Sequence, residues 1–380
     1  MTDSARVPEE QLKVWRKATS EGNRFRVARE LKKQGRKVIG VVSDYVPEEA
    51  IYAAGMLPWR IIGAWREDVA QATLHRPVNA EVYATHVLES LLAGELDFLD
   101  GIVIPHLDDD QRRLWDVCVH LDMMPLIHYL YIPRKESEYC LTEFAGGIRR
   151  LVGELEQLGA VKVSQESLRQ AIGVYNKWRR CLMAIYELRK REVPPLSGSE
   201  VLSITTASFT MLKEEFTQQV EAVFGQLKKR KTSLSRVRPR ILVSSENLDD
   251  PAYLELVEDA GCLVAMDDLD TGSRYIWQEV DTSMDPFYGL AKRYLSRPTG
   301  PQMFDWDKQA NQVMQWVKEF KIDGVLNFPT MNSYWREMFT PYFHSALSKA
   351  GTPMMTFSRE YQLANVGQLR TRIEAFLETL

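Results

Sequence analysis

The sequence predicts an α/β protein with parallel β-sheets, and three observations lead to this class. Short apolar segments of strand length alternate with longer segments of helical periodicity, as in βαβ units. Residues 39–63 have a counterpart at 238–268, where an apolar strand, a serine-bearing turn, a proline and an Ala-Gly pair return in the same order. Residues 96–116 and 319–339 form a second such pair around an Asp-Gly turn and an apolar strand. The repeat therefore predicts two related halves, each with a parallel sheet.

The first half is expected to contain strands at residues 38–43 and 102–105, with a third near 125–127. Pro47 suits the first position of the helix that follows the first strand, because an N–H missing there breaks no hydrogen bond. The two glutamates after it carry negative charge and are expected to stabilise the positive N-terminal end of the helix dipole. Gly55 is expected to end that helix in a left-handed conformation.

The middle of the chain, residues 141–235, is helical in pattern. Ser197 and Glu200 have the spacing of a capping box and are expected to open a helix. The basic stretch at 228–240 is interpreted as a solvated boundary. One predicted helix carries an apolar stripe made of Leu168, Ile172, Tyr175, Leu182, Ile185 and Leu188.

The second half repeats the first, with strands expected at 240–244 and 323–328 and a third near 353–355. Asp250 is a good N-cap for the helix after the first of these strands, and Gly261 is expected to end it. The predicted division is an N-terminal α/β lobe with a leading helix at 1–139, a helical segment at 140–237 and a C-terminal α/β lobe at 238–380.

The composition is that of an ordinary globular protein, with 45% apolar residues and a net charge of -4 spread over 380 residues. Dispersed basic residues argue against nucleic acid as the main partner. No apolar run reaches the ~18 residues of a membrane span, and the first residues do not resemble a signal peptide, so a cytoplasmic location is expected. The cysteines are too widely spaced for a compact metal site and are expected to be free thiols.

Four predicted loops follow strands and are expected to share the ligand-binding edge of their sheets. In open parallel sheets, ligands gather beyond the carboxyl ends of the strands, where helix N-termini present free N–H groups. Two halves facing each other would line a cleft with these loops. The loops are 43–46, 106–110, 244–250 and 328–332.

Three consecutive carboxylates, Asp108 to Asp110, stand in the second loop. Such a cluster suits Mg²⁺, which prefers carboxylate oxygens. The alternative, which we favour, is that one aspartate caps the next helix while the others stabilise its positive end. The six histidines lack the spacing of a metal site, and no nucleophile elbow, P-loop or dinucleotide fingerprint is present. The residues alone thus indicate a cleft without a self-contained catalytic set.

Several segments resemble the subunits of 2-hydroxyacyl-CoA dehydratases and benzoyl-CoA reductases, in the order in which that family has them. They include SDYVPEEAIYAAGMLPWRI, LDGIVIPHLDDDQRRL, DGVLNFPTMNSYW and VGQLRTRIEAFLE, and they extend over nearly the whole chain. The resemblance implies two flavodoxin-like lobes joined by a helical segment, and pairing with a homologous subunit. It also implies a [4Fe-4S] cluster held by three cysteines in active subunits, and an ATP-hydrolysing activator that donates electrons for ketyl-radical chemistry on an acyl-CoA thioester.

The sequence departs from this family at the three positions where the resemblance implies cluster cysteines. Asp108, Thr299 and Thr330 stand there, and none of the four cysteines lies in these loops. Thiolates hold iron–sulfur clusters, and threonine does not replace them. We therefore expect no cofactor in this chain and a [4Fe-4S] cluster in a cysteine-bearing partner subunit.

The leading hypothesis is accordingly a supporting subunit of an anaerobic acyl-CoA dehydratase or reductase complex. An anionic Asp44 beside Asp108 would suit neither a cluster nor a radical anion. Acyl-CoA is expected near the interface with the partner, and candidate cleft residues are Ser43, Asp44, Tyr45, Glu48, Asp109 and Arg112. The alternatives are a stand-alone protein that binds a small molecule or metal in the cleft, and a structural partner without a ligand. The sequence leaves the dehydratase and reductase branches, the acyl group and the stoichiometry open.

Overall fold

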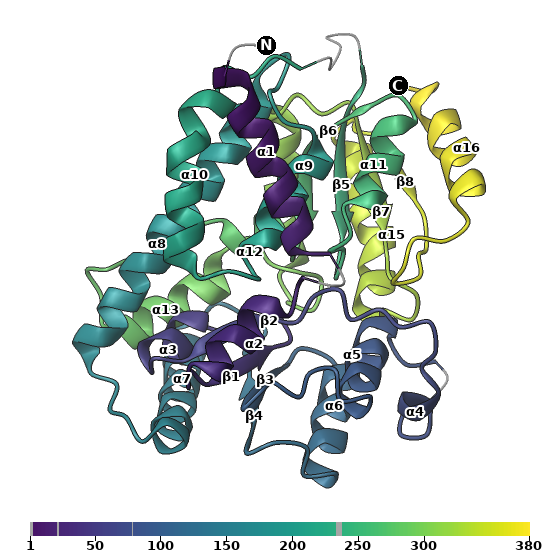
Figure 1. Cartoon of the computed structure of the whole chain (residues 1–380). Coiled ribbons are helices and arrows are strands. Elements are labelled where there is room, and N and C mark those ends of the chain that lie inside the picture. Colours follow the sequence, from purple (N-terminus) through teal and green to yellow (C-terminus); the bar gives the residue numbers. More distant parts are fainter. Residues whose placement is uncertain (1–2, 21–22, 78, 233–237) are drawn as a thin grey trace. The chain divides into compact units, whose positions relative to one another are not determined.

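A computed structural model describes residues 3–20, 23–77, 79–232 and 238–380 (Figure 1). Within these residues it has two four-stranded sheets, with strand orders β2-β1-β3-β4 and β6-β5-β7-β8. Every strand pair in both sheets is parallel. Each order matches the first four strands of a flavodoxin-like sheet, so the expected two flavodoxin-like lobes are confirmed.

The strands lie where the repeat predicts them. The third strand expected in each half, near 125–127 and 353–355, is β4 in the first half and β8 in the second. Gly55 and Gly261 both have a positive φ at the ends of the helices that follow the first strand of each half, as expected. The strands are β1 Val38–Val41, β2 Leu57–Arg60, β3 Gly101–His106, β4 Leu126–Tyr131, β5 Arg240–Ser245, β6 Leu263–Leu269, β7 Gly324–Phe328 and β8 Met354–Thr356.

Helices connect the strands and fill the stretch of sequence between the two sheets, as the sequence pattern predicts. None of the helices in the described ranges is long and apolar enough to cross a membrane. The helices are α1 Asp3–Ala18, α2 Arg26–Lys33, α3 Glu48–Ala53, α4 Ala70–Thr73, α5 Val82–Leu92, α6 Asp109–His120, α7 Glu138–Gly159, α8 Gln165–Glu187, α9 Gly198–Ala207, α10 Lys213–Leu227, α11 Ala252–Asp259, α12 Ser273–Ile276, α13 Pro286–Ser296, α14 Trp306–Glu319, α15 Tyr334–Lys349 and α16 Val366–Leu377, with a short 3₁₀ turn at Leu188–Lys190.

The chain forms two compact units that interleave in sequence. The C-terminal-sheet unit takes the chain up to Ser20, from Arg180 to Trp277 and from Trp306 to the end. The N-terminal-sheet unit takes the two remaining stretches, which end at Arg179 and Asp305. The unit boundary therefore falls inside the long helix α8.

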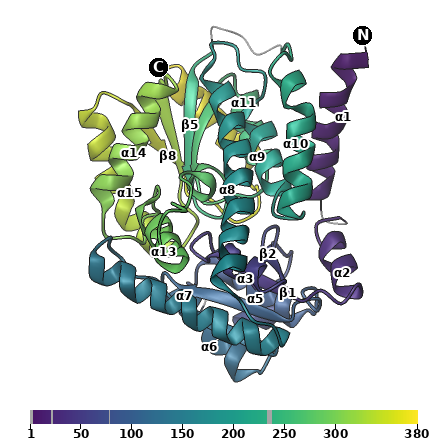
Figure 2. The ribbon, with the colours of Figure 1, turned by 90° about the vertical axis from the view of Figure 1, so that its left-hand side faces the viewer.

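The core of the N-terminal-sheet unit joins β1, β3 and β4 to α3, α7 and α13. Helix α7 lies along this sheet in Figure 2 and packs against β4. Helix α13, which comes from far along the chain, begins at a strong local signal. Asp285 accepts hydrogen bonds from the N–H groups of Phe287 and Tyr288, and Pro286 occupies the first turn.

The core of the C-terminal-sheet unit joins β5, β6 and β7 to α9, α11 and α16. The leading helix α1 also belongs to this unit, although the sequence division grouped it with the N-terminal lobe. It runs beside α10 in Figure 2, and the buried Trp15 donates a hydrogen bond to Gln219 Oε1 at 3.0 Å. The capping box that opens α9 is formed by Ser197 and Glu200, as predicted.

Gly198, in the first turn of α9, packs directly on β6. A Cβ there would lie 2.5 Å from Val264 Cβ and 2.9 Å from its carbonyl oxygen. We expect Gly198→Ala to lower the free energy of unfolding by about 1–3 kcal/mol, because helix and strand must separate. The matched control is Gly225→Ala in α10, where a Cβ meets nothing within 4 Å and the change should stabilise by up to about 1 kcal/mol. Urea denaturation of both variants checks this, and equal effects would contradict it.

Candidate functional site

The four loops expected at the ligand edge do follow the carboxyl ends of parallel strands. In the N-terminal-sheet unit the loops after β1 and β3 lie at one edge, since these strands are direct neighbours in parallel register. In the C-terminal-sheet unit the same holds for the loops after β5 and β7. Each unit thus has its own candidate edge, built from two adjacent loops.

The turn after β1 is bound to the loop that contains Thr299. Asp44 is 3% exposed and pairs with Arg297 at 2.8 Å, while Ser43 Oγ donates to Asp44 Oδ1 at 3.1 Å. The Arg297 guanidinium lies 4.3 Å from the centre of the Tyr45 ring, and the Tyr45 hydroxyl accepts from the N–H of Gly300 at 3.1 Å. Ser43, Asp44 and Tyr45 therefore meet the segment after α13. The aspartate is compensated by a buried arginine, a pairing that the sequence pattern does not indicate.

The three carboxylates after β3 each have a separate structural partner. Asp108 is the N-cap of α6 and accepts from the N–H of Gln111 at 2.7 Å. Asp109 is exposed and pairs with Arg113 at 3.4 Å, and Asp110 pairs with Arg76 at 2.5 Å. No group of three or more potential metal ligands occurs among the described residues. The favoured capping interpretation of Asp108 is confirmed.

Arg112 and His106 lie on the exposed side of this same edge. Arg112 is exposed in the first turns of α6, and the half-buried His106 stacks on Tyr129 with ring centres 5.3 Å apart. Burial, together with Arg134 and Arg112, lowers the pKa of His106, which favours the neutral imidazole. The edge therefore offers a neutral aromatic surface with a cation beside it.

Glu48 and Glu49 begin α3, but both side chains point into the protein core. Glu48 is 1% exposed and accepts from the Tyr175 hydroxyl at 3.1 Å. Glu49 forms a buried ion pair with Arg179 and accepts from the Tyr294 hydroxyl at 2.8 Å. The first turn of α3 thus anchors α8 and α13 within the N-terminal-sheet unit.

The charge on Glu49 is maintained by its neighbours. Burial alone would raise its pKa, but Arg179 and Arg293 outweigh burial and leave the pKa below the ordinary value. Burial raises the pKa of Tyr294, and the Glu49 carboxylate raises it further, so that phenol stays protonated as a hydrogen-bond donor. The sequence did not predict this network, because it assigned both glutamates to the helix dipole and Glu48 also to the cleft, whereas both side chains are buried.

Thr299 and Thr330, two of the positions where the family resemblance implies cysteine, are both buried. Thr299 is 2% exposed and belongs to the N-terminal-sheet unit. Thr330 is in the C-terminal-sheet unit, where its Oγ1 donates to the Glu246 carbonyl at 3.3 Å and its backbone forms a bridge with Arg359. These two hydroxyls and the capping carboxylate of Asp108 are not ligands for an iron–sulfur cluster.

The cysteines present do not replace the missing ligands. Cys118 and Cys262 are buried, and burial raises the pKa of each thiol to about 12, which disfavours the thiolate that binds iron. Cys140 and Cys181 are half-buried and belong to different units. The residues of this chain therefore do not fit a [4Fe-4S] cluster.

Comparison with known proteins shows which family the sequence matches. The sequence model of the family described as "2-hydroxyglutaryl-CoA dehydratase, D-component" matches residues 44–380. The chain is 28% identical to the beta subunit of (R)-2-hydroxyglutaryl-CoA dehydratase of Acidaminococcus fermentans over 361 residues, 92% of this chain and 94% of the relative. It is 24% identical to the (R)-phenyllactyl-CoA dehydratase beta subunit of Clostridium sporogenes over 93% of this chain and 94% of the relative.

A relative from the other branch is similar at a comparable level. The chain is 25% identical to one of the subunits of the benzoyl-CoA reductase of Thauera aromatica over 314 residues, 80% of each protein. The sequence resemblance stated above is thus confirmed for both branches.

Proposed function

Because the chain belongs to the 2-hydroxyglutaryl-CoA dehydratase D-component family, we propose that it is the supporting, non-cluster subunit of an acyl-CoA dehydratase or benzoyl-CoA reductase-type complex. The observation that carries the proposal is the combination of the family match over residues 44–380 with Asp108, Thr299 and Thr330 at the expected ligand positions. The complex would be cytoplasmic. A cysteine-bearing homologous subunit would hold the [4Fe-4S] cluster, and an ATP-hydrolysing activator would supply its electrons.

The chain would act by shaping the site rather than by handling electrons. The Asp44–Arg297 pair and the Tyr45 hydroxyl hold the loop with Thr299 closed against the turn after β1. The neutral His106 and the exposed Arg112 and Asp109 remain at the edge after β3. We propose that this edge borders the acyl-CoA of the complex and that the closed loop replaces the volume a cluster would need.

The first expected result is that the isolated chain binds no [4Fe-4S] cluster. After anaerobic incubation with iron and sulfide, its iron content and its visible absorbance should stay at background, because no three thiolates converge. A cysteine-bearing homologue from the same host, treated in parallel, is the positive control. A stoichiometric cluster absorbance with about four irons per chain would contradict the proposal.

The proposal as a whole is tested by isolating the chain from its native host under anaerobic conditions through an affinity tag. We expect a cysteine-bearing homologue and iron to co-elute, and the complex to turn over an acyl-CoA thioester. The host lacking this chain is the matched comparison. If its homologue stays soluble and fully active on the thioester, or if the tagged chain elutes alone and colourless, the supporting-subunit function is wrong.

A further inference from the structure

The two sheets of the described chain have four edges, and three of them are protected against a further strand. In the N-terminal-sheet unit the outer strand β2 is fully buried and contains Pro58, which has no N–H to donate to a neighbour. In the C-terminal-sheet unit the outer strand β6 is also fully buried, and its Val264 carbonyl accepts from Arg189 at 2.8 Å. The remaining outer strand of that unit, β8, has only three residues. Proteins protect sheet edges in these ways because an open edge pairs with other chains.

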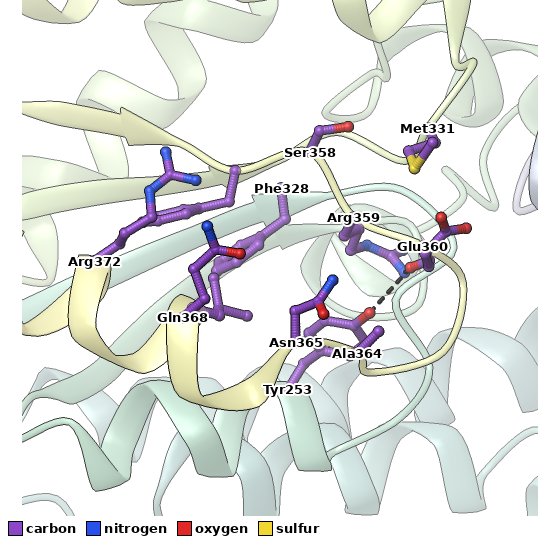
Figure 3. Close-up of a pocket in the computed structure, with 12 residues that line it drawn as sticks. Tyr253, Phe328, Met331, Ser358, Arg359, Glu360, Ala364, Asn365, Gln368 and Arg372 are labelled. Carbon is purple, nitrogen blue, oxygen red and sulfur yellow. Dashed lines mark hydrogen bonds between the residues drawn. The ribbon is translucent and has the colours of Figure 1, made fainter.

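Strand β8 is short because the chain leaves the sheet directly after it. Figure 3 shows the segment that follows, from Ser358 to Ala364, passing over to α16, where it lines a small pocket of about 140 Å³. The Tyr253 hydroxyl fixes this segment by donating to the carbonyls of Glu360 and Gln362 at 3.0 and 2.6 Å. Held in this way, the segment does not lengthen β8, and this edge stays too short to recruit a strand.

The fourth edge, formed by β4, has none of these protections. In the described part of the chain β4 pairs with β3 alone, along all six of its residues. Its sequence, LIHYLY, contains no proline and no permanent charge, and its His128 bonds to Glu154 of α7 at 2.8 Å. In the flavodoxin-like order 2-1-3-4-5 this is the place of the fifth strand. Strand β4 is therefore a full-length edge strand that is open to pairing.

Exposed apolar side chains lie at both ends of this strand. Val119 in the last turn of α6 and Leu121 directly after it precede the strand, and both are exposed. Tyr131 ends the strand with 51% of its surface exposed, and Tyr139 follows in the first turn of α7 with 76% exposed. Single exposed apolar residues are common, but four around one open edge indicate a surface that another protein covers.

The side chains on the α6 side of this edge are already ordered. Trp115 of α6 lies 4.9 Å from the Tyr129 ring and donates to the Ile127 carbonyl at 3.3 Å, an oxygen that has a second lone pair. The His106 ring lies 5.9 Å from that of Tyr131. Because these groups are held before any partner arrives, pairing costs less conformational entropy.

We propose that β4 pairs with β4 of a second copy of this chain, antiparallel, about a twofold axis through Tyr129. Directly opposed residues of an antiparallel pair share a face of the sheet, so this axis places Tyr129 opposite its own copy and Ile127 opposite Tyr131. On the α7 face, His128 lies opposite Leu130. Aromatic–aromatic and aromatic–β-branched pairs stabilise neighbouring strands, and no like charges face each other in this register. The strand is therefore complementary to itself.

The same axis brings the exposed ends of the strand together. Since the strands are antiparallel, the end of β4 in one copy lies beside its beginning in the other. Tyr131 and Tyr139 of one copy thus approach Val119 and Leu121 of the other, and this contact occurs twice, as in any isologous interface. The N-terminal sheets of the two copies become one sheet of eight strands. The inference does not rest on the proposed function, but in such a complex it requires two copies of this chain.

The test is sedimentation velocity of the purified full chain at several micromolar concentrations, without any other subunit. We expect a dimer, and we expect Tyr129→Lys and Tyr129→Glu each to weaken it about tenfold or more, because each places two like charges opposite each other on the axis. An equal mixture of these two variants should re-form the dimer, since lysine then faces glutamate. The matched control is Tyr334→Lys, which changes an exposed tyrosine of α15 and should leave the dimer intact.

Circular dichroism of each variant shows whether it is folded. Tyr131→Lys changes an exposed side chain and should also weaken the dimer, so it decides the question if the Tyr129 variants unfold. The inference is wrong if the wild type is a monomer, if the dimer persists in Tyr131→Lys and Tyr129→Lys, or if the folded lysine and glutamate variants stay monomeric when mixed. It is also wrong if β4 pairs only with a different subunit. Because the chain is measured alone, this result is separate from co-purification of a partner, which tests the proposed function.

Discussion

Replacing Glu49 by alanine is expected to lower the free energy of unfolding by about 3–5 kcal/mol. The carboxylate is fully buried and lies against Arg179 and the Tyr294 hydroxyl. Arg293 is buried beside it and its pKa is lowered, first by burial and then by the like charge of Arg179. Removing Glu49 leaves these guanidinium groups without their anion in a medium that solvates charge poorly, and this cost exceeds the loss of the pair itself.

Urea denaturation followed by circular dichroism measures the loss, and two further variants make it specific. Glu30→Ala removes an exposed partner of Arg26 in the same unit and should cost less than about 1 kcal/mol. The double variant Glu49→Ala/Arg179→Met should be more stable than Glu49→Ala, because it removes one uncompensated charge. If Glu49→Ala costs as little as Glu30→Ala, the network does not stabilise the unit.

The two sheets could be predicted because their signals are local and occur twice. Each half has an apolar strand, a proline at the start of the next helix and a glycine at its end. Gly55 and Gly261 adopt the positive φ that such helix ends require. Pro47 and Pro251 lie one residue before the first helical residue, at the N-cap, a shift of the size expected for helix boundaries.

The sequence contains a signal for one member of a buried ion pair, Arg179, but not for its partner. The apolar stripe of α8 has a gap between Tyr175 and Leu182, and Arg179 occupies that position. An arginine on a buried stripe indicates a buried anion, since such a charge is stable inside a protein only when paired. Periodicity gives the face of a helix but not its partner: Glu49, which pairs with Arg179, lies far from α8 in sequence. Arg297 is likewise far in sequence from Asp44, with which it pairs.

Glu81 is expected to make the stability of the protein fall as the pH rises from 5 to 8. Glu81 is a buried residue at the N-cap of α5, where its Oε2 accepts from the N–H of Ala84 at 2.9 Å. Burial, reinforced by the carboxylates of Asp108 and Asp110, raises its pKa from 4.5 to about 8. The candidate edge after β3 thus lies beside a carboxyl group that is protonated at neutral pH.

The pKa of the Glu81 carboxyl is about 8 in the folded protein and 4.5 in the unfolded chain. Since the folded protein holds this proton more tightly, the stabilisation is fully present below pH 4.5 and is lost as the pH approaches 8. The loss amounts to about 4 kcal/mol at pH 8. Glu81→Gln keeps an amide oxygen to accept from Ala84 but cannot ionise, so the variant should lack this fall and exceed the wild type in stability at pH 8.

Urea denaturation of the wild type and Glu81→Gln at pH 5, 6, 7 and 8 checks the prediction, with Glu30→Gln as the exposed control. The difference between Glu81→Gln and wild type should grow steadily with pH, whereas Glu30→Gln should follow the wild type. If the wild type and Glu81→Gln lose stability in parallel over this range, Glu81 is already ionised in the folded protein. The carboxylates of Asp108 and Asp110 would then be screened from it by Arg76, which pairs with Asp110 at 2.5 Å.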